Sequence, residues 1–534
     1  MAFGEALNPS TYREAAVGSK DERWGYLIRP EESRLRCMKL LLDGRQELPS
    51  YVSINELRDQ LEATGKSVHI VVADYLRLLF KHAKEILSRR YGEYFIAHTK
   101  IIVVLTVPAV WSDAAKDATL RAAEAAGMGE NLALISEPEA AAVYALQAIQ
   151  PNHLTTGHNF VVVDAGGGTV DLISYEIKQV SPLRIEESAP GSGACCGGAM
   201  LNVRFIEWMR AKLGEDLFIS IRDGKPKSWQ MATKHFEEYV KRNFDPDEDT
   251  EFNIPLAGVA DNEAVGIEQG FLTITSKEVA SIFKPIITEI IQLVQGQMTH
   301  LHTSGKSVNG IILVGGFGQS ECLLKIMRMR FASGNNAALP PNSRLEVMQP
   351  TNAWTAVVRG AVIRGLEGTE MVLNRKARRH YGVRVNARFD DNLHPLSCKY
   401  WDIYDESWRA KDRMSWFIRK GQAVSATEPA IFAFYRDIPT GGSKIVHDEL
   451  IACDLDQAPT GFEHGLRTST HVLCRLTSDL SKVPITYFKN QVTVDGKRFQ
   501  RISYKLGMRV ESGGLRFDLR VGNVEYGSVK ATFE

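Results

Sequence analysis

The sequence has no C-x-x-C pair, no excess of charge of either sign and no long apolar run, and each absence excludes a class of protein. Lys plus Arg and Asp plus Glu both total 64, so no overall field attracts nucleic acid or an anionic membrane. The apolar run Ile101–Val110 is about half as long as a bilayer-spanning helix. Met1–Ser10 lacks the basic and apolar regions of a secretory signal. We therefore expect a cytoplasmic protein that binds neither membranes nor nucleic acid.

The seven cysteines are scattered and odd in number, which argues against a disulfide framework and fits a reducing compartment. The adjacent pair Cys195 and Cys196 could carry redox chemistry, although two small residues in a glycine-rich turn are the simpler interpretation. At 534 residues the chain is too long for one hydrophobic core. Its composition, 44% hydrophobic and 24% charged, is that of an ordinary globular protein.

Up to Gly368, short β-like runs alternate with helical segments, which predicts an α/β fold with mostly parallel sheets. Ser136 with Glu139, and Thr275 with Glu278, predict capping boxes at two helix starts. The predicted strands are 101–106, 132–135, 160–164, 170–177, 271–274 and 311–314. The predicted helices are 71–88, 113–126, 139–149, 200–213, 276–301 and 320–331. The order strand, helix, strand, helix beginning at Ile101 recurs from Ile311 to Gly365.

After the basic stretch Arg375–Arg379 the pattern changes to short strands separated by turns. The runs 431–435, 471–476, 499–506 and 515–521 predict an antiparallel β module of about 150 residues. The basic stretch could be a nucleic-acid or localisation patch. A solvated linker between two domains is the preferred interpretation, because the chain around it is neutral.

The most informative segment runs from Phe160 to Asp171 and reads F-V-V-V-D-A-G-G-G-T-V-D. An apolar strand enters three glycines, and the chain returns as a second strand. Glycine lets backbone N–H groups face a phosphate without a Cβ in the way. Asp164 and Asp171 can hold a hydrated Mg²⁺, and Thr169 offers a hydroxyl. This segment therefore predicts a hairpin that binds phosphate and metal rather than a plain turn.

Other glycines and one carboxylate lie beside predicted helix starts. Gly315 and Gly316 follow strand 311–314, where open α/β sheets bind ligands, although a tight strand-to-helix turn also needs glycine. Glu137 follows strand 132–135, either as a site carboxylate or as a partner of the helix dipole. Like Gly315 and Gly316, the pair Gly197-Gly198 could contact a ligand or could simply form a tight turn.

Together these motifs, in this order, resemble the nucleotide-binding domain of the seventy-kilodalton heat-shock chaperones, in the actin and sugar-kinase superfamily. Thr106–Ala114 resembles that family's TVPAYFNDAQ run, and Leu134–Ala142 resembles its INEPTAAA. Asp164–Asp171 resembles its second phosphate loop, and Ile312–Gly316 its adenosine loop. The likeness spans about residues 20–370. The variants GGFGQS and RRHYGVRV look more like the divergent, large heat-shock relatives.

The resemblance implies an actin-like (ribonuclease H-like) two-lobe nucleotide-binding domain over residues 1–370. Lobe I would cover about 1–150 and lobe II about 151–370. A basic linker, 371–380, and a β-rich C-terminal module, 381–534, would follow.

The resemblance also implies a site for ATP or ADP with Mg²⁺, with Pro108 relaying the nucleotide state. The catalytic residues it implies are Asp164, Asp171, Thr169 and Glu137, of which the three carboxylates would lie near the metal. The nucleotide-binding residues it implies are Gly166, Gly167, Gly168, Thr169, Gly198, Glu238, Lys241, Arg242, Gly315 and Gly316.

Some positions depart from the family pattern. No loop rich in Gly and Thr precedes Thr106, so the first lobe is expected to be incomplete. Either the protein is a degenerate member, or the recorded start belongs to a longer chain. Lys39 could be the family's catalytic lysine or an ordinary surface lysine. Gln319 replaces an arginine that stacks on adenine, and Trp354 stands where the family usually has an aspartate.

The favoured function is therefore an ATP-binding, chaperone-like protein whose ATPase activity is weak or impaired. The alternatives are a non-catalytic nucleotide sensor or scaffold and, disfavoured for want of a carboxylate base between the lobes, a sugar kinase. Unfolded or extended peptide and co-chaperones would be the partners that the resemblance implies, with the β module adding a peptide strand at a sheet edge.

Overall fold

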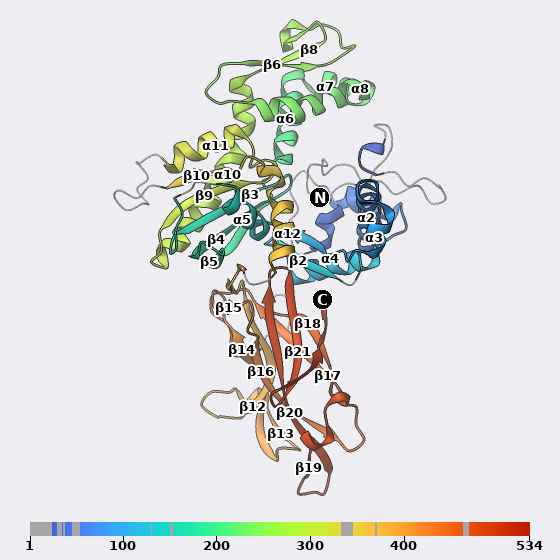
Figure 1. The fold of residues 1–534 in the computed structure, drawn as a ribbon, viewed down its shortest axis with the longest axis vertical. Coiled ribbons are helices and arrows are strands. Elements are labelled where there is room, and N and C mark those ends of the chain that lie inside the picture. The colour runs from blue at the N-terminus through green and yellow to red at the C-terminus, as the bar shows by residue number, and fades with distance from the viewer. Residues whose placement is uncertain are drawn as a thin grey trace. The chain divides into compact units, whose positions relative to one another are not determined.

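The computed structural model describes residues 24–28, 35, 38–44, 54–129, 131–149, 153–332, 345–368, 371–462 and 469–533. The chain divides into two compact units. The first unit comprises Met1–Pro182 and Gly191–Gly368, and the second comprises Leu183–Pro190 and Thr369–Glu534. Helices and strands alternate in the first unit, whereas strands dominate the second (Figure 1). The prediction of an α/β fold followed by a β-rich C-terminal region is confirmed.

The elements of the first unit follow the predicted alternation closely. Its α-helices are α1 (Ile54–Glu62), α2 (Val68–Tyr91), α3 (Glu93–His98), α4 (Asp113–Ala125), α5 (Glu137–Ala148), α6 (Ala199–Leu213), α7 (Glu215–Gly224), α8 (Pro226–His235), α9 (Lys241–Asn243), α10 (Ser276–Thr303), α11 (Glu321–Met327) and α12 (Ala356–Glu367). Its strands are β1 (Val103–Val107), β2 (Leu132–Ser136), β3 (Asn159–Ala165), β4 (Val170–Gln179), β5 (Arg184–Ala194, shared with the second unit), β6 (Glu251–Pro255), β7 (Ile267–Glu268), β8 (Phe271–Thr275), β9 (Val308–Val314) and β10 (Glu346–Met348). Short 3-10 helices are η1 (Gly25–Leu27), η2 (Met38–Leu42), η4 (Glu263–Val265) and η6 (Ala353–Thr355), and π-helices are η3 (Phe236–Val240) and η5 (Arg328–Ala332).

The largest sheet of the first unit has the strand order β10-β9-β3-β4-β5. β3 pairs in parallel with β9 and antiparallel with β4, so the predicted hairpin 160–177 forms. Every residue of β3 is buried, which requires cover on both faces of the sheet. Helices α5 and α10 both pack against β3, β4 and β9. The carboxyl ends of β3 and β9 therefore lie side by side at one edge.

The predicted internal echo also forms, because β1 pairs in parallel with β2 just as β9 pairs with β10. The helices that end the two copies, α5 and α12, pack against each other. A Cβ on Gly360 of α12 would overlap the carbonyl oxygen of Ala140 on α5, so only glycine permits this close approach.

One of the two predicted capping boxes is confirmed and the other is wrong. Thr275 accepts from the backbone N–H of Glu278, whose carboxylate accepts from the Thr275 N–H. Ser136 makes no side-chain cap on α5. Glu139 is instead fully buried and pairs with Arg364 of α12 at 3.6 Å, so packing against the neighbouring helix determines where this side chain points.

The second unit is built from antiparallel strands. The two larger sheets have the orders β13-β14-β12-β17-β18-β23 and β16-β20-β21-β22, with β19 on β20 and a separate β11-β15 pair. Its strands are β11 (Asn374–Lys376), β12 (His380–Arg388), β13 (Lys399–Asp402), β14 (Ser407–Ile418), β15 (Ala423–Ser425), β16 (Ala430–Pro439), β17 (Ile445–Cys453), β18 (Thr470–Asp479), β19 (Lys489–Val492), β20 (Arg498–Glu511), β21 (Gly514–Val521), β22 (Val524–Ser528) and β23 (Lys530–Phe533). Its 3-10 helices are η8 (Leu396–Cys398), η9 (Leu480–Lys482) and η10 (Ile485–Tyr487).

The two larger sheets share one hydrophobic core. Buried Tyr381 and Leu450 from one sheet and Phe432 and Leu506 from the other belong to the same cluster, as in a β-sandwich. The predicted antiparallel module is thus present.

The basic stretch Arg375–Arg379 is part of this folded unit. Its first residues lie in β11, and Arg375 is only 5% exposed. The N–H of Lys376 donates to Glu187, and the N–H of Leu373 donates to the carbonyl oxygen of Ile185, so β5 and the β11 segment are hydrogen-bonded within the second unit. A solvated linker would instead expose these groups.

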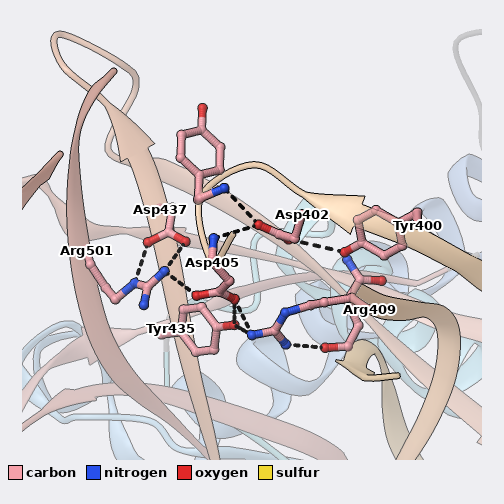
Figure 2. A network of polar contacts seen from close by, with 9 residues as sticks. Tyr400, Asp402, Asp405, Arg409, Tyr435, Asp437 and Arg501 are labelled. Atoms are coloured by element: carbon pink, nitrogen blue, oxygen red, sulfur yellow. Dashed lines mark hydrogen bonds and ion pairs between the residues drawn. The ribbon is translucent and has the colours of Figure 1, made fainter. Parts of the chain in front are cut away.

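The turn between β13 and β14 is fastened by a cluster of charged and phenolic side chains, which we name the Asp405 network (Figure 2). Asp405 Oδ1 accepts from Arg501 at 2.6 Å, and its Oδ2 accepts from the Tyr435 hydroxyl at 2.7 Å and from Arg409. The other members, from β13 and β16, are Tyr400, Asp402 and Asp437. The network joins the β13–β14 hairpin to β16 and β20.

Candidate functional site

The three glycines of the predicted phosphate loop form a tight turn between β3 and β4. The Gly166 N–H donates to the Thr169 carbonyl at 2.9 Å. Asp164 and Asp171 are cross-strand partners in the hairpin, so their side chains lie on the same face. Both are almost fully buried, at 3% and 1% exposure. The sequence order D-A-G-G-G-T-V-D thus becomes a pair of adjacent carboxylates at the base of a glycine turn.

Gly197 and Gly198, at the start of α6, pack directly on this turn. The N–H groups of Gly197, Gly198 and Ala199 donate to the carbonyls of Gly168, Gly166 and Gly167 at 3.2, 3.0 and 2.7 Å. A Cβ on Gly197 would lie 2.5 Å from the Gly167 carbonyl oxygen. These glycines are therefore needed for close approach of two backbones, and Gly198 lies beside the phosphate loop.

Gly315, at the end of β9, meets the same hairpin from the other side. It adopts a φ of +91°, and a Cβ there would lie 2.5 Å from both Asp164 Oδ1 and the Ala165 carbonyl oxygen. The N–H groups of Phe317 and Gly318 donate to that carbonyl at 2.9 Å. Gly316 is exposed, and nothing lies within 4 Å of the place where its Cβ would be. Gly315 lies beside Asp164 because β3 and β9 pair in parallel and end at the same edge of the sheet.

Glu137, at the first position of α5, forms the charged part of the site with Lys39. Lys39 Nζ lies 2.9 Å from Glu137 Oε1 and 5.2 Å from the centre of the Trp111 ring. Lys39 is exposed and pairs with Glu137, and its role as the family's catalytic lysine stays a prediction. The signal in the sequence was weak, because η2, which carries Lys39, is a single short helix in a segment without clear periodicity.

Asp171 is the carboxylate with the most perturbed ionisation in the site. Burial and the nearby Glu137 carboxylate raise the pKa of Asp171 to about 6, and hydrogen bonds from Thr169 and the Val110 N–H together with the charge of Lys39 oppose that rise. The Val110 N–H donates to Asp171 Oδ1 at 3.4 Å. A buried carboxylate that stays partly protonated near pH 6 indicates a place where an additional cation would be stabilising.

Of the predicted trio Glu238, Lys241 and Arg242, the structure brings only Lys241 to the glycines. Lys241 Nζ donates to the Gly198 carbonyl at 2.9 Å and lies 3.3 Å from Asn202 Oδ1. Burial lowers the pKa of Lys241 to about 8, with Arg242 adding to the fall and Glu237 opposing it. Glu238 and Arg242 are exposed, and Glu238 lies 3.8 Å from Lys234.

The π-helix η3 directly precedes Lys241. A π-helical turn inserts one residue into the helical repeat and changes which side chains share a face. This register shift is invisible in the sequence, and it changes the faces of the helix on which Glu238 and Lys241 lie.

The remaining positions are placed as follows. Pro108 is buried after β1, Gln319 is exposed after the Gly315 turn, and Trp354 is 41% exposed in η6. Part of the segment before Thr106, where the family's loop of Gly and Thr was not found, lies outside the described residues.

A direct protein cage for a metal is absent from the part of the chain that the structure describes. No group of three or more His, Cys, Asp or Glu side chains there could hold a metal ion. Mg²⁺, however, usually keeps several waters and is held by one or two carboxylates and the phosphates of a nucleotide. The buried pair Asp164 and Asp171 fits that second mode. Among the described helices, none is long and apolar enough to cross a membrane.

Comparison with known proteins covers most of these residues. A family described as "Hsp70 protein" matches residues 73–343, which include Glu137 and the glycines of 166–168, 197–198 and 315–316 but not Lys39. A second family, "Domain of unknown function (DUF8568)", matches residues 375–454.

Individual proteins give the same indication. The chain is 26% identical over 418 residues to "Heat shock 70 kDa protein 12B" of Homo sapiens, covering 64% of this chain and 59% of that protein. It is 24% identical to the human "Heat shock 70 kDa protein 12A", covering 63% of this chain and 59% of that protein. It is 27% identical to "Chaperone protein DnaK" of Mycoplasma mycoides, covering 59% of this chain and 48% of that protein. The aligned part thus spans less than two thirds of each of these relatives.

Proposed function

Because the chain belongs to the Hsp70 family, we propose that its first unit binds an adenine nucleotide with Mg²⁺ in an actin-like, two-lobe arrangement. The observation that carries this proposal is the meeting of three glycine segments beside two buried carboxylates. Gly166–Gly168, Gly197–Gly198 and Gly315 come from separate parts of the chain and approach one another backbone to backbone. Backbone without side chains beside carboxylates is the surface that a phosphate chain and its metal require.

The phosphate end of the nucleotide would lie on the hairpin. Gly166, Gly167, Gly168 and Thr169 would contact the β- and γ-phosphates. Bound Mg²⁺ would neutralise charge on those phosphates. Asp164 and Asp171 would hold it through its water ligands, and Glu137, oriented by Lys39, would join the same water network.

The nucleoside end would lie between Gly198 and Gly315-Gly316. Lys241 would fix the position of Gly198 through its 2.9 Å hydrogen bond to the Gly198 carbonyl. Glu238 and Arg242, which are exposed, would reach the ribose and adenine from the solvent side. The polar Gln319 in place of an arginine would weaken stacking on the base.

We expect hydrolysis to be slow. In-line phosphoryl transfer needs charge stabilisation from both sides of the γ-phosphate. In the sequence as given, no loop of Gly and Thr precedes Thr106 to supply the second side, and among the described residues Lys39, paired with Glu137, would bring positive charge there. A nucleotide sensor or scaffold is therefore the second candidate, and turnover comparable to that of a full chaperone would exclude it.

We also propose a chaperone role and a cytoplasmic location, on the basis of family membership. Extended peptide and co-chaperones are the partners that family membership suggests for the second unit. The separation of a nucleotide part, 1–370, from a β-rich part, 381–534, is likewise proposed, although the segment Leu183–Pro190, which includes the first half of β5, belongs to the second unit.

The test is calorimetry with Mg·ATP on matched glycine variants. A Cβ on Gly168 would meet nothing within 4 Å, so Gly168→Val should fold normally and yet obstruct the phosphates. We expect at least a 30-fold loss of affinity, about 2 kcal/mol. Gly296→Val on α10, where the new side chain also enters open space, is the control and should bind like the wild type. Equal affinity of the wild type and Gly168→Val would show that the phosphates lie elsewhere.

A further inference from the structure

Gln297 on α10 is a buried amide that joins two strands of the main sheet. It is 4% exposed, between the buried Val294 and Met298. Its Oε1 accepts from the Ser174 hydroxyl of β4 at 2.7 Å, and its Nε2 donates to the Ser192 hydroxyl of β5 at 2.8 Å. A buried amide is costly unless hydrogen-bonded, so this side chain determines the spacing between Ser174 and Ser192.

Each serine lies within three residues of a position at the base of the phosphate loop. Ser174 is three residues beyond Asp171 on β4. Ser192 directly precedes Gly193, where a Cβ would lie 2.6 Å from the Val170 carbonyl oxygen and 3.3 Å from the Asp171 Cα. The end of β5 is thus held against the start of β4 at the residue that carries the most perturbed carboxylate.

From Gly193 the chain leads within a few residues to Gly197–Ala199. The N–H groups of those residues hold the three carbonyls of the glycine turn. A shift of the end of β5 would therefore move these donors and reorient the peptide units of the turn. Since the carbonyls and the N–H groups of a peptide unit rotate together, the N–H groups facing a phosphate would move as well.

We propose that Gln297 is a positioning residue for the phosphate loop, acting through Ser192 and the end of β5. This inference rests on the proposed nucleotide site. If the inference is right, loss of the Gln297 amide weakens binding of the β-phosphate and leaves binding of the nucleoside unchanged. A buried residue with a purely structural role would lower the affinity for every nucleotide alike.

The test compares AMP with ADP in the presence of Mg²⁺, by calorimetry on the whole chain. Gln297→Met keeps the side-chain volume and removes both hydrogen bonds. We expect its preference for ADP over AMP to fall about tenfold, with AMP affinity unchanged. Ser192→Ala, which removes one hydroxyl, should give a smaller fall in the same direction. Gln292→Met, at an exposed position of the same helix, is the matched control.

A double-mutant cycle tests whether Gln297 acts on the phosphate loop through Ser192. If Gln297 acts through Ser192, the effects of Gln297→Met and Ser192→Ala will not add. An unchanged ADP-to-AMP preference in both variants, with the wild type binding ADP, overturns the positioning role alone. Absence of ADP binding by the wild type and by Gln292→Met overturns the nucleotide site and this inference together. Should Gln297→Met fail to fold, the ADP-to-AMP preference of Ser192→Ala decides.

Discussion

Asp171 in the first unit and Asp405 in the second are both carboxylates held among polar partners, and their ionisation is perturbed in opposite directions. Burial and the Glu137 carboxylate raise the pKa of Asp171 to about 6. Burial alone would also raise the pKa of Asp405, but hydrogen bonds from Tyr435 and Arg501 and the charges of Arg409 and Arg501 outweigh it, so that pKa lies below its ordinary value.

The difference is the one expected between the proposed ligand site and an ion-pair network that stabilises the fold. Asp405 meets two guanidinium groups and a phenol, so its charge is compensated within the protein (Figure 2). At Asp171 burial and then the Glu137 carboxylate raise the pKa against the opposing charge of Lys39, so the ionised form is disfavoured. A carboxylate that is disfavoured as an anion stabilises the fold little and becomes favourable when a cation arrives. Removing each should therefore have opposite consequences.

The largest expected effect is on ligand binding by Asp171→Asn. Without the anion, Mg·ATP affinity should fall at least 100-fold, about 2.7 kcal/mol. The melting temperature without ligand should rise at neutral pH, because the variant no longer buries a disfavoured charge. Calorimetry and thermal melting measure the two quantities, and Asp261→Asn, at an exposed position, serves as the control. A lower melting temperature with intact affinity would mean that Asp171 is a structural residue.

The converse change, Asp405→Asn, should destabilise the β13–β14 hairpin by about 2 kcal/mol and leave Mg·ATP affinity unaltered. An amide cannot accept from two guanidinium groups without turning its own N–H donors toward them. Hydrogen exchange resolved by mass spectrometry over Ser407–Ile418 reports the local effect in the intact chain. Asp391→Asn in the neighbouring loop, where the side chain is 78% exposed, is the control.

As the pH falls from 7, the Mg·ATP affinity of the first unit should fall before the stability of the second unit does. Because the folded-state pKa of Asp171 lies above the ordinary value of 3.8, the folded protein binds the proton more tightly, and its stability falls as the pH rises from 3.8 to about 6. The cation needs the ionised form, so Mg·ATP affinity should rise about tenfold between pH 5 and pH 7. Calorimetry at several pH values measures this rise, and because the ATP phosphates titrate near the same pH, the ratio of wild-type to Asp171→Asn affinity is the quantity that should rise tenfold.

At Asp405 the stability depends on pH with the opposite sign. Its folded-state pKa is depressed, so its contribution is present above pH 3.8 and is lost only as the pH falls through that lower value. Hydrogen-exchange protection of β14 should therefore be constant from pH 7 to pH 4 once corrected for intrinsic rates. Loss of protection near pH 5 would contradict the assignment.

The smallest effect is expected for Tyr435→Phe, which removes one of the three donors to Asp405. The cost should be about 1 kcal/mol, since the remaining guanidinium groups still satisfy the carboxylate. Hydrogen exchange over β14 detects a change of this size. An effect as large as that of Asp405→Asn would show that the phenol, rather than the charges, holds the hairpin.

Residues with a local signature were predictable from the sequence. The strand pair around Gly166–Gly168 follows from apolar runs on both sides of three glycines, and Thr275 with Glu278 capped a helix as expected. The approach of Gly315 to Asp164 required only the rule that parallel strands place their carboxyl ends together.

Features that depend on distant contacts were not predictable. β5 was missed because Pro190, Gly191 and Gly193 indicate a turn, whereas the structure uses Gly193 for close packing against β4. Lys39 pairs with a carboxylate 98 residues away, which no local pattern encodes. Arg375 was assigned to a solvated linker because charge usually marks surface, yet the strand β11 buries it.

The division of β5 between the two units has a consequence for the order of events during synthesis. Asn374 donates to Glu186 across 188 residues of sequence. At typical translation rates of about 5–20 residues per second, the first half of β5 would wait on the order of 10–40 s before that partner is made. The hairpin of β3 and β4 can pair as soon as it emerges. A ribosome paused before residue 370 would therefore carry a β5 strand that can already pair with β4 but whose other edge is still open.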